Sequence, residues 1–461
     1  MPKRYTSRRT FLSRSSAAIA GAGWTALADP ARAAAQTVGV KPSDFPDLTI
    51  KEARVYQTDL TGFHPLNSPD HGEVASLITA NGLEALYTLG NRNSTPHWLE
   101  WAKARLVGKT VIDLLPTISS TSGLKANYGY DANVRPPGFI PQRRETLLGD
   151  TSVFVTDALN GSGLQMRGAG DWPNWYTAAA DVLLWDLLGQ TVNKPIYKLL
   201  NGGVGGSKDR ILAYASSAHH PTIEEYAPEV TRAKTMNFKG YKIHPGPGQH
   251  KDSKNAIPSY IGHIEEIKQV RAAAGEEFVL AHDPVQAYNV YEAMAVGRVL
   301  DELNYAWFED PIRTTDMDGL IALNKALGLP LHVGEFLYSI ADFAEYISKG
   351  ALNVARLIAD NVGGISGGMR VGLLADAFNI ECTPHNWGNA IDIMLHFHLE
   401  LALPNCSWFE LPMPPETADH PFMNTRFRPD AEGHIHAPTL PGMGVEINRG
   451  EMDRRTKAVL R

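Results

Sequence analysis

Short apolar runs alternate with amphipathic stretches from residue 211 onward. Each run is rich in β-forming residues and ends at a polar residue, and a stretch with helical periodicity follows, such as residues 260–275. Runs that are apolar on both faces are typical of buried parallel strands joined by helices. The runs are ILAYASS, GYKIHPG, FVLAHDP, AWFEDPI, LHVGEF, VARLIADN, IECTPHNW and SWFEL. Eight strands of this kind predict a β/α barrel.

The polar residues that end these runs recur at a nearly constant interval. From Asp283 onward, successive run ends are 25 or 26 residues apart, close to the roughly 30 residues of one β/α unit. The interval after Lys242 is longer, because residues 245–260 form an insertion. Strand ends of a barrel converge on one face, so we expect these side chains to meet there. They are Lys242, His244, Asp283, Glu309, Glu335, Asp360, His385 and Glu410.

Three consecutive run ends are carboxylates, namely Asp283, Glu309 and Glu335. One acidic run end could simply cap the following helix, but three together would repel one another and raise one another's pKa. Carboxylate oxygens that leave room for water and a substrate oxygen suit a hard dication such as Mg²⁺. The sequence therefore predicts a Mg²⁺ site, with helix caps or a salt-bridge network as the alternative.

Two further pairs of run ends suggest acid–base chemistry. Asp360 and His385 end adjacent runs, and a carboxylate beside a histidine orients the ring and raises its basicity, as in a general base. Lys242 and His244 are two residues apart, so on a strand they share one face. The second strand of a barrel lies roughly opposite the sixth and seventh, so the two pairs would flank a substrate.

The N-terminal residues 1–35 have the parts of an export signal, with a basic start, a weakly apolar middle and a small-residue cleavage site. Arg8 and Arg9, followed by Phe11 and Leu12, resemble a twin-arginine signal. We expect an exported, periplasmic protein without a membrane anchor after cleavage. An N-terminal anchor is the alternative, although the middle segment is short for a span.

Composition and charge restrict the class of protein. The 461 residues are 43% apolar and 20% charged, with a net charge of −7, which is typical of a globular protein. The excess of acidic residues and the lack of a basic stripe predict no nucleic-acid partner. Cys382 and Cys406 are too few for a disulfide framework, and we expect two buried free thiols.

The ordered run ends resemble those of the enolase superfamily, mandelate racemase subgroup. The matching residues are Lys242 and His244 in K-x-H, Asp283 in AHDP, Glu309 in WFEDP, Glu335 in VGEF, Asp360 in IADNVGG, His385 in CTPHNW and Glu410 in WFEL. The similarity covers roughly residues 48–425, including a helix expected over 178–203. It implies a modified TIM barrel, (β/α)₇β, at 205–412, an N-terminal α+β capping domain at 48–200, and a C-terminal segment, 413–461, folded back on the cap.

The resemblance also implies a reaction, in which a proton α to a carboxylate is removed while Mg²⁺ stabilises the negative charge. Lys242 would add a cation and Glu410 a neutral hydrogen-bond donor. Members often carry a second lysine as the base where His244 stands, which disfavours a two-base racemase. We therefore expect dehydration of a sugar acid to a 2-keto-3-deoxy acid, with His385 delivering the proton to the leaving hydroxyl.

Other outcomes of the same chemistry are racemisation, epimerisation or cycloisomerisation. A different class of function is a non-catalytic exported protein that binds a metal or a sugar acid. The loop at residues 61–72, with His64 and His71, is a candidate substrate contact. The resemblance also implies a homo-oligomer.

Overall fold

The computed structural model describes residues 46–61, 71–90, 95–119, 174–200, 207–246 and 259–461. The chain divides into two compact units, residues 1–48 and 49–461, and the elements below belong to the second. The expected export signal, His64 and most of the 61–72 loop lie outside the described residues. Among the described helices, none combines the length and apolar character that crossing a bilayer requires.

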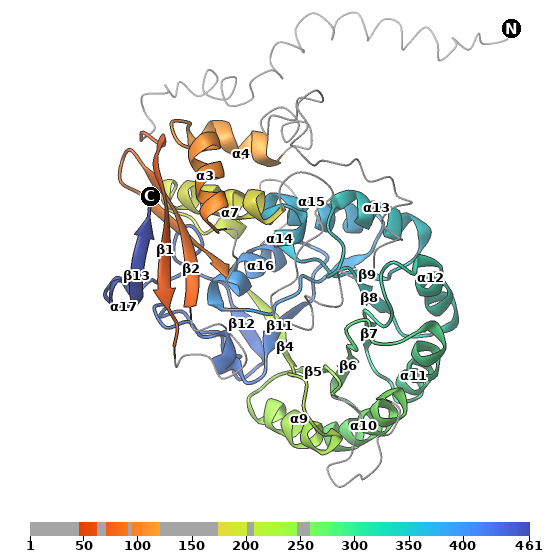
Figure 1. Cartoon of the computed structure of the whole chain (residues 1–461). Helices are drawn as coiled ribbons and strands as arrows, with labels where there is room; N and C mark the ends of the chain where they lie inside the picture. The colour runs from red at the N-terminus through yellow and green to blue at the C-terminus, as the bar shows by residue number, and fades with distance from the viewer. Residues whose placement is uncertain (1–45, 62–70, 91–94, 120–173, 201–206, 247–258) are drawn as a thin grey trace, which may run out of the picture. The chain divides into compact units, whose positions relative to one another are not determined.

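Each of the eight apolar runs forms one strand of a curled parallel sheet (Figure 1). The strands are β4 (Arg210–Ser216), β5 (Gly240–Ile243), β6 (Val279–His282), β7 (Trp307–Glu309), β8 (Leu331–Val333), β9 (Val354–Ala355), β10 (Glu381–Cys382) and β11 (Trp408–Pro412). They pair in chain order from β4 to β10, with β11 beside β4. The Cys382 N–H donates to the Asn405 oxygen at 2.8 Å, so the two outer edges approach each other just before β11. The predicted modified barrel is confirmed.

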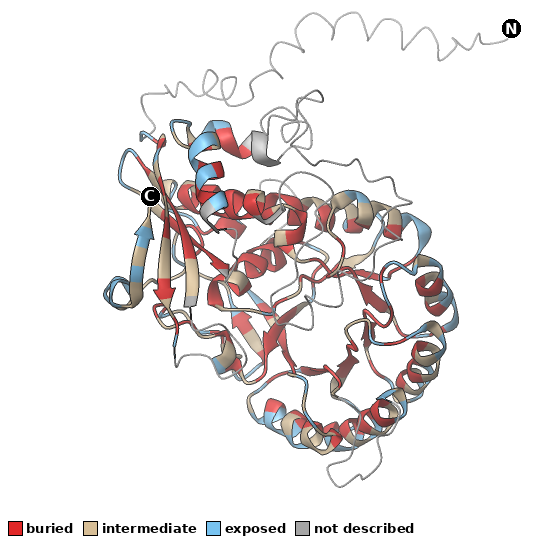
Figure 2. Ribbon diagram, viewed as in Figure 1, coloured by how far each residue is buried: buried red, intermediate tan, exposed pale blue. Residues whose placement is uncertain are grey.

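Helices follow the strands and cover the outside of the curled sheet, with their buried faces turned inward (Figure 2). They are α9 (Tyr226–Thr235), α10 (Ser259–Ala274), α11 (Val290–Glu302), α12 (Met317–Ala326), α13 (Ile340–Lys349), α14 (Ala359–Val362), α15 (Gly364–Ala377) and α16 (Ala390–Ala402). Local sequence sets their ends: Asn289 and Glu292 form a capping box at α11. Helix α13 begins at the Ser339 cap and stops at Gly350, which is left-handed with φ 69°.

A smaller antiparallel sheet precedes the barrel in the chain. Its strands β1 (Ile50–Asp59), β2 (His71–Thr79) and β3 (Glu84–Gly90) are followed by α3 (Thr95–Arg105), α4 (Val111–Ser119), α7 (Asn174–Thr191) and α8 (Ile196–Leu200). The C-terminal segment, with β12 (His434–His436), α17 (Arg449–Arg455) and β13 (Thr456–Leu460), returns to this sheet, because β13 pairs with β1. Two short 3₁₀ turns lie at Ile223–Glu225 and Pro415–Ala418.

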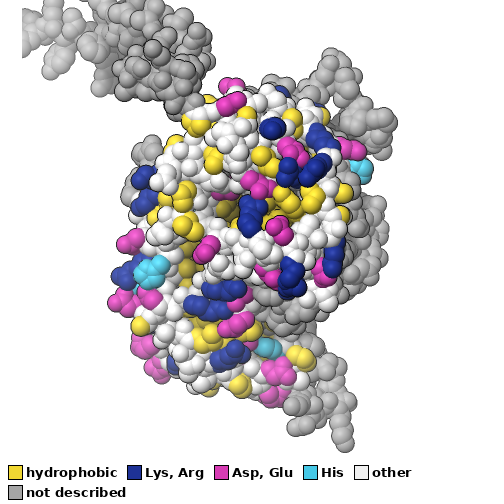
Figure 3. All heavy atoms as spheres, turned by 90° about the vertical axis from the view of Figure 1, so that its left-hand side faces the viewer, with side chains coloured by type: hydrophobic (Ala, Val, Ile, Leu, Met, Phe, Trp, Pro, Cys, Tyr) yellow, Lys and Arg dark blue, Asp and Glu magenta, His cyan; other side chains and the backbone are white. Residues whose placement is uncertain are grey.

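The side of the molecule that carries β1, β13 and α17 mixes both charge signs (Figure 3). Ion pairs join Lys457 to Asp59 at 3.0 Å and Arg449 to Glu84 at 2.9 Å. Exposed pairs of this kind add little to stability. On the face that Figure 3 shows, basic and acidic side chains alternate and form no basic stripe, in agreement with the charge pattern of the sequence.

The helix expected over residues 178–203 is instead two helices, α7 and α8. Asn193 adopts a left-handed φ of 52° between them, and Pro195 lacks the N–H that a continuous helix would need. Cys382 and Cys406 are both free and buried, as the sequence predicted.

The last turn of α7, at Gly189, packs closely against Gly442 of the C-terminal segment. A Cβ on Gly189 would lie 2.6 Å from the Gly442 Cα and 2.8 Å from the Lys194 oxygen. We expect Gly189→Ala to lower the free energy of unfolding by about 1–3 kcal/mol, because backbone atoms cannot yield cheaply. The matched control is Gly450→Ala in α17, where the nearest atom is 3.7 Å away, and which should raise stability by at most about 1 kcal/mol. Urea unfolding followed by circular dichroism measures both; equal effects would contradict the packing.

Candidate active site

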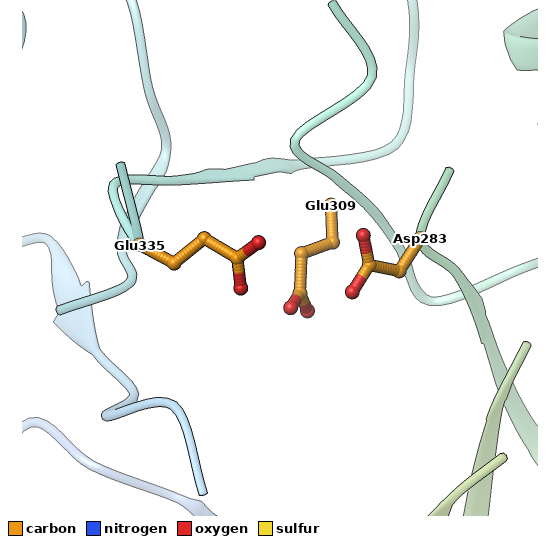
Figure 4. Close-up of side chains that lie close together, drawn as sticks. All are labelled: Asp283, Glu309 and Glu335. Atoms are coloured by element: carbon orange, nitrogen blue, oxygen red, sulfur yellow. The ribbon is translucent and has the colours of Figure 1, made fainter. Parts of the chain in front are cut away.

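Three carboxylates converge at the ends of neighbouring barrel strands, as Figure 4 shows. Asp283 follows β6, Glu309 ends β7, and Glu335 lies two residues after β8. All three are buried, and one oxygen of each lies within 4.8 Å of the others. Opposite ligands of Mg²⁺ are about 4.2 Å apart, since each lies about 2.1 Å from the ion. Small side-chain rotations would therefore be enough to close the three oxygens around a divalent metal.

The charge balance of this cluster also fits a cation. Burial raises the pKa of Glu335 well above its usual range, and the charges of Asp283 and Asp310 raise it further. Burial likewise raises the pKa of Glu309 to about 7, although Arg356 and Lys242 oppose this. Both shifts arise mainly from burial, which a bound cation would counteract, and the donor set is the hard oxygen set that Mg²⁺ prefers.

Lys242 lies inside the same cluster and is fully buried. Its Nζ contacts Asp283 Oδ2 at 2.8 Å, Glu309 Oε1 at 2.5 Å and Glu410 Oε1 at 2.8 Å. An ammonium group has three donors; Lys242 donates hydrogen bonds to Asp283 and Glu309 and forms an ion pair with Glu410. Burial and Arg356 lower the pKa of Lys242, but the three carboxylates outweigh them and raise it well above its usual range. Lys242 is therefore a buried cation that contacts protein carboxylates in this structure, and its expected role as a cation that aids the reaction stays a prediction.

Arg356 is a second buried cation, and the sequence reasoning missed it. It directly follows β9, its Nε lies 2.5 Å from Glu309 Oε1, and its Nη2 donates to Glu410 Oε2. The available signal was an arginine within the apolar run VARLI. A charged side chain at such a position needs buried acidic partners.

Glu410 lies within β11 and is ionised. Burial alone would raise its pKa, but Arg356 and Lys242 hold it well below the usual range. Its Oε2 also accepts the Asn386 N–H at 2.9 Å. In this structure Glu410 is thus placed to accept hydrogen bonds, and its expected role as a neutral donor stays a prediction.

The expected pair of Asp360 and His385 is not the pairing that the structure shows. Asp360 is not at a strand end but in α14, five residues after β9, and it accepts a hydrogen bond from the Tyr87 hydroxyl at 3.0 Å. The carboxylate beside His385 is Glu335, whose Oε2 lies 3.4 Å from Nε2. Burial lowers the pKa of His385 to about 3, and Glu410 only partly offsets this. The ring is thus neutral near pH 7 and can accept a proton, although its basicity is lowered instead of raised.

His244 follows β5 and places both ring nitrogens near oxygen atoms. Its Nδ1 lies 2.5 Å from the Ser217 carbonyl oxygen, and its Nε2 lies 2.9 Å from Asp283 Oδ2. Both ring nitrogens of His244 thus lie within hydrogen-bonding distance of oxygen atoms. Trp387, which is 40% exposed, packs edge-on against His244 with ring centroids 5.3 Å apart. His244 therefore lies between the carboxylate of Asp283 and a partly exposed aromatic side chain.

Known proteins share this arrangement of strands. Residues 225–451 match the family described as "Enolase C-terminal domain-like". An arabinonate dehydratase from Saccharolobus solfataricus is 29% identical over 276 residues, which cover 59% of this chain and 70% of that protein. A D-galactarolactone cycloisomerase from Agrobacterium fabrum is 25% identical over 280 residues, which cover 58% of this chain and 70% of that protein. The crystal structure of D-glucarate dehydratase from Agrobacterium tumefaciens, complexed with magnesium, has a TM-score of 0.68 and 23% identity, covering 90% of this chain and all of that one.

The chain belongs to the enolase superfamily, and within it to the mandelate racemase subgroup. Several of the relatives are named as dehydratases of sugar acids, and another is named as a cycloisomerase. The family resemblance noted in the sequence is thereby confirmed.

The raised pKa values make metal binding dependent on pH. A proton competes with a metal for a carboxylate, and burial raises the pKa of Glu309 to about 7. We expect the affinity of the metal-free protein for Mg²⁺ to weaken about tenfold for each pH unit below 7 and to level off above about pH 8. Isothermal titration at pH 6, 7 and 8 measures this. Glu309→Gln, which cannot bind a proton there, should bind Mg²⁺ weakly with a flatter pH dependence, and an unchanged slope would contradict the assignment.

Proposed function

We propose that this enzyme dehydrates a sugar acid to a 2-keto-3-deoxy acid in a Mg²⁺-dependent reaction. The observation that carries the proposal is the buried triad of Asp283, Glu309 and Glu335 with the neutral ring of His385 against it. The names of the relatives support the substrate class, because they include dehydratases of several sugar acids. When bound by the triad, Mg²⁺ would supply positive charge against the substrate carboxylate, which makes the adjacent α proton more acidic.

The residues around the triad divide the remaining work. We assign His385 the removal of the α proton, in place of the proton delivery to the leaving hydroxyl expected from the sequence, since its ring is neutral near pH 7. His244 donates a proton to the β-hydroxyl, which leaves as water while a double bond forms between the α and β carbons. The resulting enol then becomes the 2-keto-3-deoxy acid. Lys242 and Arg356 contact no reacting atom in this scheme and keep the carboxylates in place.

Lys242 supports dehydration over racemisation. A two-base racemase needs a proton acceptor on each face of the α carbon. On the second face, Lys242 is a cation that contacts three carboxylates, and our proposal gives His244 the role of the donor. This pairing of an acceptor with a donor suits the loss of water.

Substitution of the two histidines separates the two proton transfers. We expect His385→Asn to lose both dehydration and exchange of the α proton with D₂O, by about 10²–10⁴-fold. His244→Gln should lose dehydration by a similar factor but keep the exchange, because it acts after the α proton has left. A Mg²⁺-supplemented screen of sugar acids with semicarbazide detection of 2-keto products, together with proton NMR in D₂O, measures both reactions.

The control for both variants is His436→Asn, an exposed histidine of β12 paired with Asp430, which should leave both rates unchanged. Retained turnover in His385→Asn would remove that residue from the mechanism. A screen in which the wild type exchanges the α proton but yields no keto product would favour an epimerase or a cycloisomerase, and ligand binding without either reaction would exclude this proposal.

We also propose that the protein is exported by the twin-arginine route, on the basis of Arg8 and Arg9 in the N-terminal sequence. In a bacterial host with this pathway, we expect a shortened protein in the periplasmic fraction. Replacing both arginines by lysine should leave the full-length protein in the cytoplasm. Periplasmic recovery of the double variant would contradict the proposal.

A further inference from the structure

Arg356 connects the two sides of the candidate active site through four acceptors. On the metal side its Nε contacts Glu309 Oε1 at 2.5 Å. On the other side its Nη2 donates to Glu410, and its Nη1 donates to the Pro384 oxygen at 3.0 Å and approaches the Thr383 oxygen at 3.4 Å. The side chain is fully buried, so these protein groups take the place of water around its guanidinium.

The acceptors on the second side either belong to the segment that carries His385 or hold that segment. Arg356 holds the carbonyl of Pro384, just before the histidine, and it holds Glu410, whose Oε2 accepts the N–H of Asn386, just after it. The His385 N–H itself donates to the Leu357 oxygen at 2.8 Å, one residue beyond Arg356. All these anchors of the His385 backbone lead to the end of β9.

We propose that Arg356 is a positioning residue that sets the distance between the metal ligand Glu309 and His385. The planar guanidinium presents donors in a fixed fork, so it can hold Glu309, Glu410 and Pro384 at the same time. A lysine offers one point charge at the end of a flexible chain and cannot reproduce this geometry. Asp360, from which this role was expected, contacts Tyr87.

A positioning role and a merely structural role predict different signs for metal binding. Arg356 is a cation beside the ligand Glu309, so it repels a divalent ion that binds there. Removing the charge should leave metal affinity unchanged or tighten it, whereas the reaction should slow because His385 is no longer held at the right distance. A residue that only stabilised the fold would weaken metal binding and activity together.

The experiment compares Arg356→Lys, Arg356→Met and the control Arg271→Lys. Arg271 is another largely buried arginine, and its hydrogen bonds go to the backbone carbonyls of residues 275, 276, 278, 303 and 304. We expect Arg356→Lys to lower kcat on the order of 10²-fold, with KM changed less than about threefold. Arg356→Met should lower kcat at least as far while binding Mn²⁺ as tightly as the wild type or up to about tenfold more tightly. Arg271→Lys should lower Tm and leave kcat and Mn²⁺ affinity unchanged.

The Mn²⁺ measurement, made by electron paramagnetic resonance, needs no turnover, whereas the kcat comparison rests on the proposed function. If the wild type acts on no sugar acid, the proposed function is wrong. The Mn²⁺ affinities of the variants would still decide the role of Arg356. Mn²⁺ affinity that falls more than about tenfold in folded Arg356→Lys overturns the inference, as does full activity of that variant. If Arg356→Met does not fold, Arg356→Lys alone decides.

Discussion

The structure depends on the balance of charge buried at the mouth of the barrel. Among the described residues there, Asp283, Glu309, Asp310, Glu335 and Glu410 bring five carboxyl groups into a region where Lys242 and Arg356 are the permanent cations. Carboxylates removed from water need partners, because an uncompensated buried charge costs several kcal/mol. The two cations neutralise part of this charge, and a divalent metal held by the triad would neutralise most of the remainder.

This balance separates the residues that hold the site from the residues that can move protons. The contacts of Lys242 are with carboxylates, and those of Arg356 are with carboxylates and backbone carbonyls. Both side chains are therefore held in place and stay charged. The histidines differ, because His385 is neutral in its buried position and His244 lies near the partly exposed Trp387. A site built in this way can keep strong fixed charges next to groups that change protonation, since the fixed charges are locked in ion pairs.

The antiparallel sheet and the barrel are joined next to this site. From β3, Tyr87 donates to Asp360 and Thr88 donates to Asp392 at 2.6 Å, which lie after β9 and β10. From α7, the buried Asp181 accepts the Ser366 N–H at 2.9 Å at the start of α15, so a side chain of one helix caps another. These contacts anchor the segments that follow β9 and β10, and thus the surroundings of His385.

The sequence by itself determined the eight strands, their order and the convergence of Asp283, Glu309 and Glu335. These features follow from a repeated local pattern and from the rule that parallel strand ends meet on one face of a barrel. Only the tertiary structure decided the partners: that Lys242 binds three carboxylates, that Asp360 faces Tyr87, and that Arg356 joins Glu309 to Glu410. Partners of this kind depend on side-chain positions to within about an ångström, between residues tens of positions apart. No periodicity along the chain encodes such distances, because they result from how the whole barrel closes.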